Sequence, residues 1–246
     1  MIIAHLTHEL GALEACSLTC RSWYIAAAPH LHNTLTLTGG GPDAHSDRRL
    51  EPLSKIHKLG LIPLVKTIRV GKWPGTSCWF IPQAFDRLSL RYFSALTNVH
   101  TLQLQYLEIY RFIPDIERYF GHFSQTLRSI TLYDPCCTPR QLSHFLSLFP
   151  NLGDIGIQDA YEYVPCATFP VAELVPFSAP KLRGRLALYN TPWVEIWTDL
   201  IASCGGLRFR HMELRDSANC TPILFEACAE TLETLRFNTS EGTFGE

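Results

Sequence analysis

The chain has 246 residues, of which 46% are hydrophobic and 18% are charged. This length and composition predict a folded protein with a sizeable core and exclude an intrinsically disordered chain. The formal net charge of −2 gives no overall attraction to nucleic acid or to an acidic membrane surface. No stretch approaches the ~20 apolar residues of a membrane-spanning helix. We therefore expect neither nucleic acid nor a membrane as a partner.

The nine cysteines are odd in number and irregularly spaced. The first ten residues, MIIAHLTHEL, have neither the basic start nor the continuous apolar stretch of a secretory signal. Both features predict that the thiols are reduced and that the protein is cytoplasmic or nuclear.

Residues 1–38 predict a small helical module. An apolar stripe at helical spacing runs through Leu6, Leu10, Leu13, Cys16 and Cys20. Cys16 and Cys20 are one helical turn apart, so a helix places both on one side, where they fill the core as small hydrophobic side chains. A structural zinc site needs four ligands, and no second closely spaced cysteine pair follows. We therefore predict no metal site.

A second short helix is indicated by Trp23, Ala27 and Leu31, which are four residues apart. Pro29 disfavours helical geometry at the residue before it, so the helix is expected to end at about that point. Residues 33–38 then alternate between polar and apolar side chains, as is typical of a strand. Because these elements bury little surface by themselves, we expect them to pack against the remaining chain or another protein.

Within this module Leu13 opens a helix, and a run of small residues leads to Cys20-Arg21-Ser22-Trp23. The step Pro29-His30-Leu31 then leads out of the module. This order resembles the later part of an F-box, especially the fungal type that continues into leucine-rich repeats. Family members usually begin with a Leu-Pro-x-Glu helix, whereas this chain begins with Met1-Ile2-Ile3. We therefore expect an F-box that is incomplete at its N-terminus.

The resemblance implies that the module binds the Skp-type adaptor of a cullin–RING ubiquitin ligase. It also implies that Trp23 lies in the core of the F-box. The residues expected to contact the adaptor are Leu6, Leu10, Leu13, Cys16, Leu18 and Cys20.

A repeated apolar-x-x-apolar-x-apolar pattern occupies the rest of the chain. The five close copies are VKTIRV (65–70), VHTLQL (99–104), LRSITL (127–132), LGDIGI (152–157) and LETLRF (232–237). The two looser copies are LRGRLAL (182–188) and LRFRHMEL (207–214). Most copies are spaced close to the ~20–29-residue period of leucine-rich repeats, and the wider intervals must hold inserted loops.

Helix-like segments lie between these copies, over residues 82–96, 114–123, 138–149, 191–203 and 221–232. Three of them begin with Thr-Pro, which supplies a capping hydroxyl and a proline at the first helical position. Alternating strands and helices also fit an ordinary α/β domain, but the recurrent register favours a solenoid with parallel strands inside and helices outside.

The expected fold class is therefore α/β, with a short helical F-box-like module followed by an irregular leucine-rich-repeat solenoid. We expect the module over residues 1–38 and a linker with a first helix over residues 39–64. The solenoid of about seven units then covers residues 65–246.

Pleating predicts which side chains line the concave face of this solenoid, because residues between the motif aliphatics point away from the core. The residues expected to bind a target protein are Arg69, Gln103, Gln105, Thr131, Tyr133, Gln158, Tyr189, Glu213, Arg215 and Arg236. Their neighbours on the same face are Thr67, Asp154, Ala187 and Asn238. Polar side chains with tyrosines and arginines suit a protein partner, although a merely solvated face has the same pattern.

The segment TGGGPDAHSD (38–47) contains adjacent His45, Ser46 and Asp47. Adjacent residues point in different directions, whereas a catalytic serine–histidine–acid relay is assembled by the fold. Its glycines lack the lysine and hydroxyl residue of a phosphate-binding loop. We therefore expect a connecting loop, no enzymatic activity and no cofactor.

These expectations predict a substrate-recognition subunit of a cullin–RING ubiquitin ligase. In this role the N-terminal module docks the adaptor, and the concave repeat face binds an unknown target protein. The alternative is a leucine-rich-repeat interaction scaffold that no longer binds the adaptor.

Overall fold

The computed structural model describes residues 6, 9–39, 51–72, 93–105, 109, 116–135, 137–160, 180, 182–191, 194–204, 206–217, 219 and 221–238. Most of the glycine-containing loop at residues 38–47 and most of the helix expected over residues 82–96 lie outside the described residues.

One parallel sheet runs through the molecule, and its strands lie side by side in chain order. The strands are β1 (Thr34–Gly39), β2 (Thr67–Lys72), β3 (Thr101–Gln105), β4 (Ser129–Tyr133), β5 (Asp154–Gln158), β6 (Arg185–Tyr189), β7 (His211–Arg215) and β8 (Thr234–Asn238). Within the described ranges, each strand pairs only with its neighbours in the sequence, so the sheet that they form is open. Parallel neighbours require the chain to cross back between strands, and the helices occupy these crossovers.

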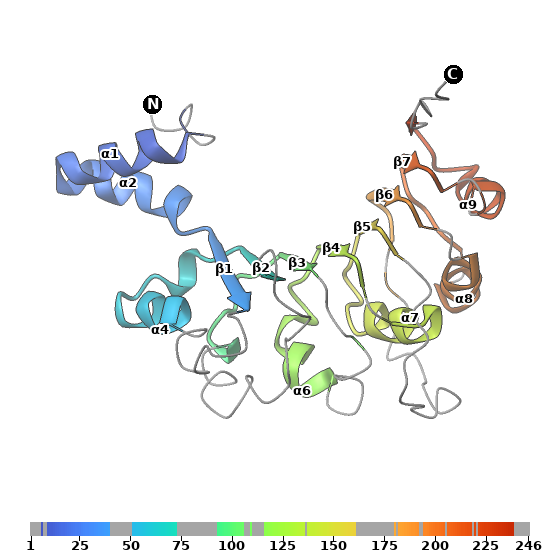
Figure 1. Ribbon diagram of the computed structural model, residues 1–246, viewed down its shortest axis with the longest axis horizontal. Helices are drawn as coiled ribbons and strands as arrows, with labels where there is room; N and C mark the ends of the chain where they lie inside the picture. The colour runs from blue at the N-terminus through green and yellow to red at the C-terminus, as the bar shows by residue number, and fades with distance from the viewer. Residues whose placement is uncertain are drawn as a thin grey trace, which may run out of the picture.

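Helices cover one side of this sheet. They are α4 (Glu51–Lys58), α6 (Ile116–Phe120), α7 (Pro139–Ser147), α8 (Val194–Cys204) and α9 (Thr221–Cys228). Two 3₁₀ turns, η2 (Ile62–Leu64) and η6 (Gly121–Phe123), complete the crossovers. Figure 1 shows the strands along the inner side of an arc and these helices along its outer side. The predicted α/β fold with parallel strands is thus confirmed.

The first strand belongs to this sheet rather than to a separate N-terminal module. Thr34 pairs with Thr67, and Leu35 pairs with Ile68. Leu35 and Leu37 are buried in the same core as the later strand aliphatics. The sheet therefore begins at Thr34 and has eight strands, whereas the sequence expectation began it at residue 65 with about seven units.

Helix α7 illustrates how the sequence starts a helix at a fixed point. The backbone N–H of Gln141 donates to the Thr138 hydroxyl at 3.3 Å. In return, Gln141 Oε1 accepts from the Thr138 N–H at 2.9 Å. Pro139 occupies the first turn, where no intrahelical partner for an N–H is available. This capping box fixes the helix start and therefore the side chains that α7 turns toward the sheet.

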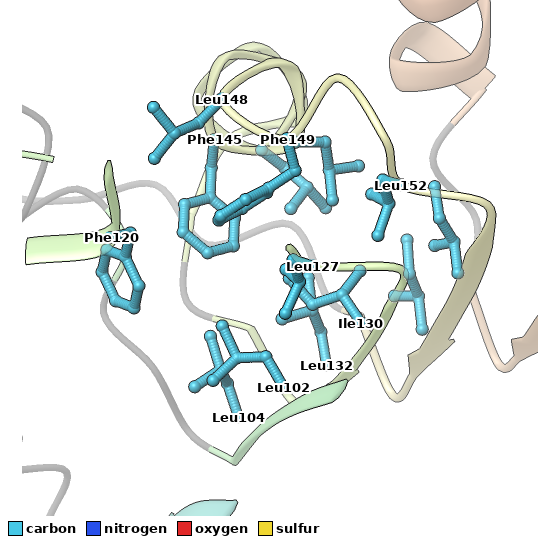
Figure 2. Packing of buried hydrophobic residues seen from close by; sticks show 14 of the residues in the cluster. Leu102, Leu104, Phe120, Leu127, Ile130, Leu132, Phe145, Leu148, Phe149 and Leu152 are labelled. Carbon is cyan, nitrogen blue, oxygen red and sulfur yellow. The ribbon is translucent and has the colours of Figure 1, made fainter. Parts of the chain in front are cut away.

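Phenylalanines from α6, from α7 and from the residues directly after α7 fill the space above the strand aliphatics (Figure 2). Phe145 meets Phe120 edge-to-face at 5.2 Å between ring centroids and meets Phe149 in the same way at 5.3 Å. Beneath the rings lie Leu102 and Ile130 from adjacent strands, both buried. One hydrophobic cluster extends in this way from β1 to α9.

The last strand is covered less well than the others. Leu214 of β7 is 2% exposed, whereas its partner Phe237 in β8 is 53% exposed. Phe237 is in contact with the ring of Phe225 from α9, at 5.8 Å between centroids. Leu235 and Phe237 of β8 thus occupy the register positions that are buried in β7, but both are exposed to solvent.

Two helices, α1 (Leu10–Thr19) and α2 (Arg21–Leu31), precede the sheet. Cys20 separates them with an extended backbone, at φ −162° and ψ 169°. Their own small cluster buries Leu13 and Ala27, with Leu6, Ala26 and Leu31 packed against it. Figure 1 shows this helix pair at the end of the arc, beyond β1.

Two expectations about this pair are wrong. Trp23 was expected in the core but is 40% exposed, because the small cluster of the helix pair packs around Leu13 and Ala27 and does not include it. The helix was expected to end at Pro29, yet α2 continues to Leu31, and the His32 N–H donates to the Ala28 carbonyl at 2.9 Å. Proline removes only its own N–H, so the neighbouring helical bonds persist.

Candidate functional site

The strand register brings the expected target-binding side chains onto one surface. Arg69 pairs with Gln103, which pairs with Thr131, which pairs with Gly156. We call the inner face the set of side chains at these alternate, uncovered positions of β1–β8. All the expected target-binding residues lie on it: Arg69, Gln103, Gln105, Thr131, Tyr133, Gln158, Tyr189, Glu213, Arg215 and Arg236.

The inner face differs between its two halves. On β1–β4 it is rich in hydroxyl side chains, including Thr34, Thr36, Thr67, Thr101, Ser129 and Thr131. Arg69 Nε donates to Gln103 Oε1 at 2.6 Å across two of these strands. From β5 onwards, the charged side chains are Asp154, Arg185, Glu213, Arg215 and Arg236. Charged side chains are therefore concentrated in the C-terminal half of the inner face.

Glu213 is the centre of a polar cluster in that half. Its carboxylate pairs with Arg185 from β6, and its side chain is 15% exposed. The Tyr189 hydroxyl donates to the same carboxylate, and this hydrogen bond is the main reason that the pKa of Glu213 is lowered, with Arg185 contributing further. Partial burial, followed by the bond to Glu213, raises the pKa of Tyr189. The cluster fixes the position of both charged groups on the inner face.

A hollow of about 310 Å³ lies on the inner face over β4, β5 and β6. Gly156 and Ala187, the smallest side chains in their row, form its floor, while Tyr133 and Tyr189 stand at its border. A Cβ on Gly156 would come within 3.1 Å of a Thr131 methyl carbon, so the floor here is closely packed as well as low. Such a hollow can receive one large side chain of a partner.

A row of residues missed by the sequence analysis lies directly after the strands. Asp134, Asp159, Asn190 and Asp216 all have a left-handed backbone, with φ between 48° and 53°. The Asp134, Asp159 and Asn190 N–H groups each donate to a carbonyl of the next strand, at 2.8, 2.9 and 2.8 Å. Aspartate and asparagine tolerate this conformation better than most residues. Their recurrence in TLYD, GIQD, ALYN and ELRD was the available signal.

The residues expected to contact an adaptor are divided between the core and the surface of the helix pair. Leu13 is buried, whereas Leu6 and Cys16 are partly buried. Leu10 and Cys20 are exposed, and Leu18 is 86% exposed. The expectation that Cys20 fills the core is wrong, because this residue forms the extended connection between the helices.

The sequence analysis did not predict that further apolar side chains on α2 are exposed. Tyr24 and Ile25 are exposed together with Trp23, although all three are large. Within the described part of the chain, α1 and α2 carry most of the exposed large hydrophobic side chains: Leu10, Leu18, Trp23, Tyr24 and Ile25. Exposed apolar side chains concentrated on one element are typical of an interaction site.

Other kinds of site have little support in the described ranges. No three histidine, cysteine, aspartate or glutamate side chains gather there in a way that could hold a metal ion. None of the described helices has the length and apolar character needed to cross a membrane. His45, Ser46 and Asp47 lie outside the described residues. The inner face and the helix pair both expose side chains that are suited to protein contacts.

Two comparisons with known proteins find no match. The chain matches no protein-family model. No curated protein matches it at a significant level.

Proposed function

We propose that this protein is the substrate-recognition subunit of a cullin–RING ubiquitin ligase. In this role α1 and α2 form an F-box-like module that docks a Skp-type adaptor. The strands and helices after them form a leucine-rich-repeat solenoid whose inner face binds a target protein. The proposal is carried by one observation: an exposed apolar helix pair is joined directly to a sheet with a polar, concave surface.

The helix pair supports the adaptor-binding role because its own core is small. Leu13 and Ala27 are its fully buried members, while Leu18 and Ile25 are exposed. Each large apolar side chain that moves from water into an interface contributes about 1.5–3 kcal/mol if it is fully buried. A partner that covers this surface would therefore gain affinity and complete the packing of the module.

The connection between module and sheet supports a receptor that holds its target at a fixed position. Only His32 and Asn33 separate α2 from β1. The Asn33 carbonyl accepts from the N–H groups of Lys66 and Thr67 at 2.8 and 2.9 Å, so the connection is tied to β2. A short, hydrogen-bonded connection fixes the direction of the inner face relative to the docked adaptor.

The alternative is a leucine-rich-repeat scaffold that does not bind the adaptor. The exposure of Trp23 favours it, because the F-box resemblance places this side chain in the core. In the scaffold role the inner face binds a protein in the same way, but no ubiquitin ligase is recruited.

A binding titration against a purified Skp-type adaptor separates these roles. We expect the chain to bind, and the Leu18→Asp/Ile25→Asp double variant to lose about tenfold or more in affinity, because two apolar contacts are replaced by charges. Arg69→Glu is the matched control: it changes the inner face and should leave adaptor affinity unchanged. Absence of binding by the unmodified chain would leave the scaffold role.

A further inference from the structure

Three hollows of the inner face meet on strand β6. The hollow of about 310 Å³ over Gly156 and Ala187 shares Arg185 with a second hollow of about 320 Å³ toward β8. It shares Tyr189 with a third hollow of about 580 Å³ beyond the strand ends. Arg185 and Tyr189 are the first and last residues of β6. The three hollows therefore adjoin one another along this strand, and we call them together the groove along β6.

The two ends of the groove carry opposite charge. The end at Arg185 also contains Arg236, His211 and Glu213, so two guanidinium groups face one carboxylate. The end beyond Tyr189 contains Asp159, Asp216 and Arg215, so two carboxylates face one guanidinium group. Arg185 remains 56% exposed despite its pairing with Glu213. A partner with one acidic and one basic group would complement both ends.

The length of β6 sets the distance between these groups. Arg185 and Tyr189 are four residues apart in an extended strand, which corresponds to about 13 Å at ~3.3 Å per residue. An extended partner has nearly the same rise per residue, so its acidic and basic side chains would also be about four residues apart.

The middle of the groove suits a large apolar side chain. Its floor is made by Gly156 and Ala187, and tyrosine rings lie at its border. Tyrosines at binding surfaces provide rigid contact area at a small cost in side-chain entropy. An aromatic ring can also pack against them edge-to-face or offset-stacked.

We propose that the groove along β6 binds an extended segment of the target protein. The segment has an acidic side chain at the Arg185–Arg236 end and a basic side chain about four residues away, at the Asp159–Asp216 end. A large apolar or aromatic side chain lies between them, over Gly156 and Ala187. This inference rests on the inner-face half of the proposed function and names the chemistry of the segment that the face selects.

Fluorescence anisotropy with labelled synthetic peptides tests the proposal on the complete chain. The probe has glutamate and lysine about four residues apart, with tryptophan midway between them. The comparison peptides carry two glutamates, two lysines, or alanine in place of tryptophan. We expect the probe to bind about fivefold more tightly than each comparison peptide, the scale of one well-placed charge pair. Equal binding of the probe and both like-charge peptides would overturn the proposal.

Two variants locate the binding on β6. Ala187→Leu fills the hollow and should weaken probe binding about tenfold, because the tryptophan loses its site. Thr36→Leu makes a similar change at an exposed inner-face position of β1 and should have no effect. Arg236→Glu should shift the preference toward the two-lysine peptide. Equal affinity of Ala187→Leu and the unmodified chain for the probe would overturn the proposal.

The adaptor titration and the peptide measurements test separate proposals, so either one can fail without the other. Probe binding without adaptor binding would remove the ligase role and leave the groove. Adaptor binding without the peptide preference would leave the ligase role and remove the groove.

Discussion

Large apolar side chains are mostly buried in the sheet, whereas several of them are exposed on the N-terminal helix pair. In the sheet, strands β1 to β7 bury their aliphatic residues, and Phe145 from α7 and Phe149 directly after this helix close the core above them. In the helix pair, Trp23 and Ile25 remain exposed. A repeated unit obtains its partner from the next unit of the same chain, whereas two isolated helices must find theirs elsewhere. The comparison teaches that apolar content is a guide to burial only where the chain supplies the covering element.

The largest difference in stability should come from truncating one aromatic side chain in each region to alanine. Phe145→Ala should lower the free energy of unfolding by about 3–5 kcal/mol, because it leaves a cavity in a packed core. Trp23→Ala should cost much less, because its ring is already partly in water. Urea denaturation of both variants measures the difference. Equal losses would show that the ring of Trp23 is packed in the folded protein.

An intermediate effect should come from the start of α7. Thr138→Ala removes the hydroxyl that accepts from the Gln141 N–H and should cost about 1 kcal/mol. Thr198→Ala in α8 is the control, because this exposed hydroxyl donates to the Val194 carbonyl within its own helix and caps no free N–H. Thermal unfolding measures both variants. A loss at Thr198 as large as that at Thr138 would contradict the importance of the capping box.

The smallest effect should be a pH dependence at Glu213. Its pKa is lowered in the folded protein, so its ionised form stabilises the fold at neutral pH. This contribution is lost as pH falls below the ordinary glutamate value of 4.5 and through the lower folded value. In Glu213→Gln, urea denaturation from neutral to acidic pH should show a shallower loss of stability. If the free energy of unfolding depends on pH identically in the variant and the unmodified chain, Glu213 does not contribute to this dependence.

Much of the sheet was predictable because its pattern repeats. The copies VHTLQL and LRSITL each fix three buried aliphatics and the side chains between them, and the pairing of Leu102 with Ile130 follows this register. The strand expected over residues 33–38 falls within the predicted N-terminal module, and its sequence lacks the leading apolar residue of the repeat. Its alternation alone contained the information that it continues the sheet.

The helix pair was less predictable because a stripe in the sequence does not identify the covering partner. Trp23 and Ala27 share a side of α2, yet only Ala27 lies in the buried cluster. The charged groove was not predictable from the sequence, for a different reason. The left-handed Asp159 and Asp216 lie after the strands, and their distance from Arg215 depends on how the turns leave the sheet.

The chain order of the strands in the sheet affects how the molecule unfolds. Among the described residues, the six inner strands pair with two neighbours each, whereas β1 pairs with β2 alone and β8 with β7 alone. Phe237 and Leu235 are already 53% and 39% exposed. Opening of this last unit therefore exposes little further apolar surface and costs little free energy. Local unfolding should therefore begin at the C-terminal end and proceed inward one unit at a time. Because the end of the groove next to Arg236 is built on β8, a bound segment would hold this end of the molecule closed.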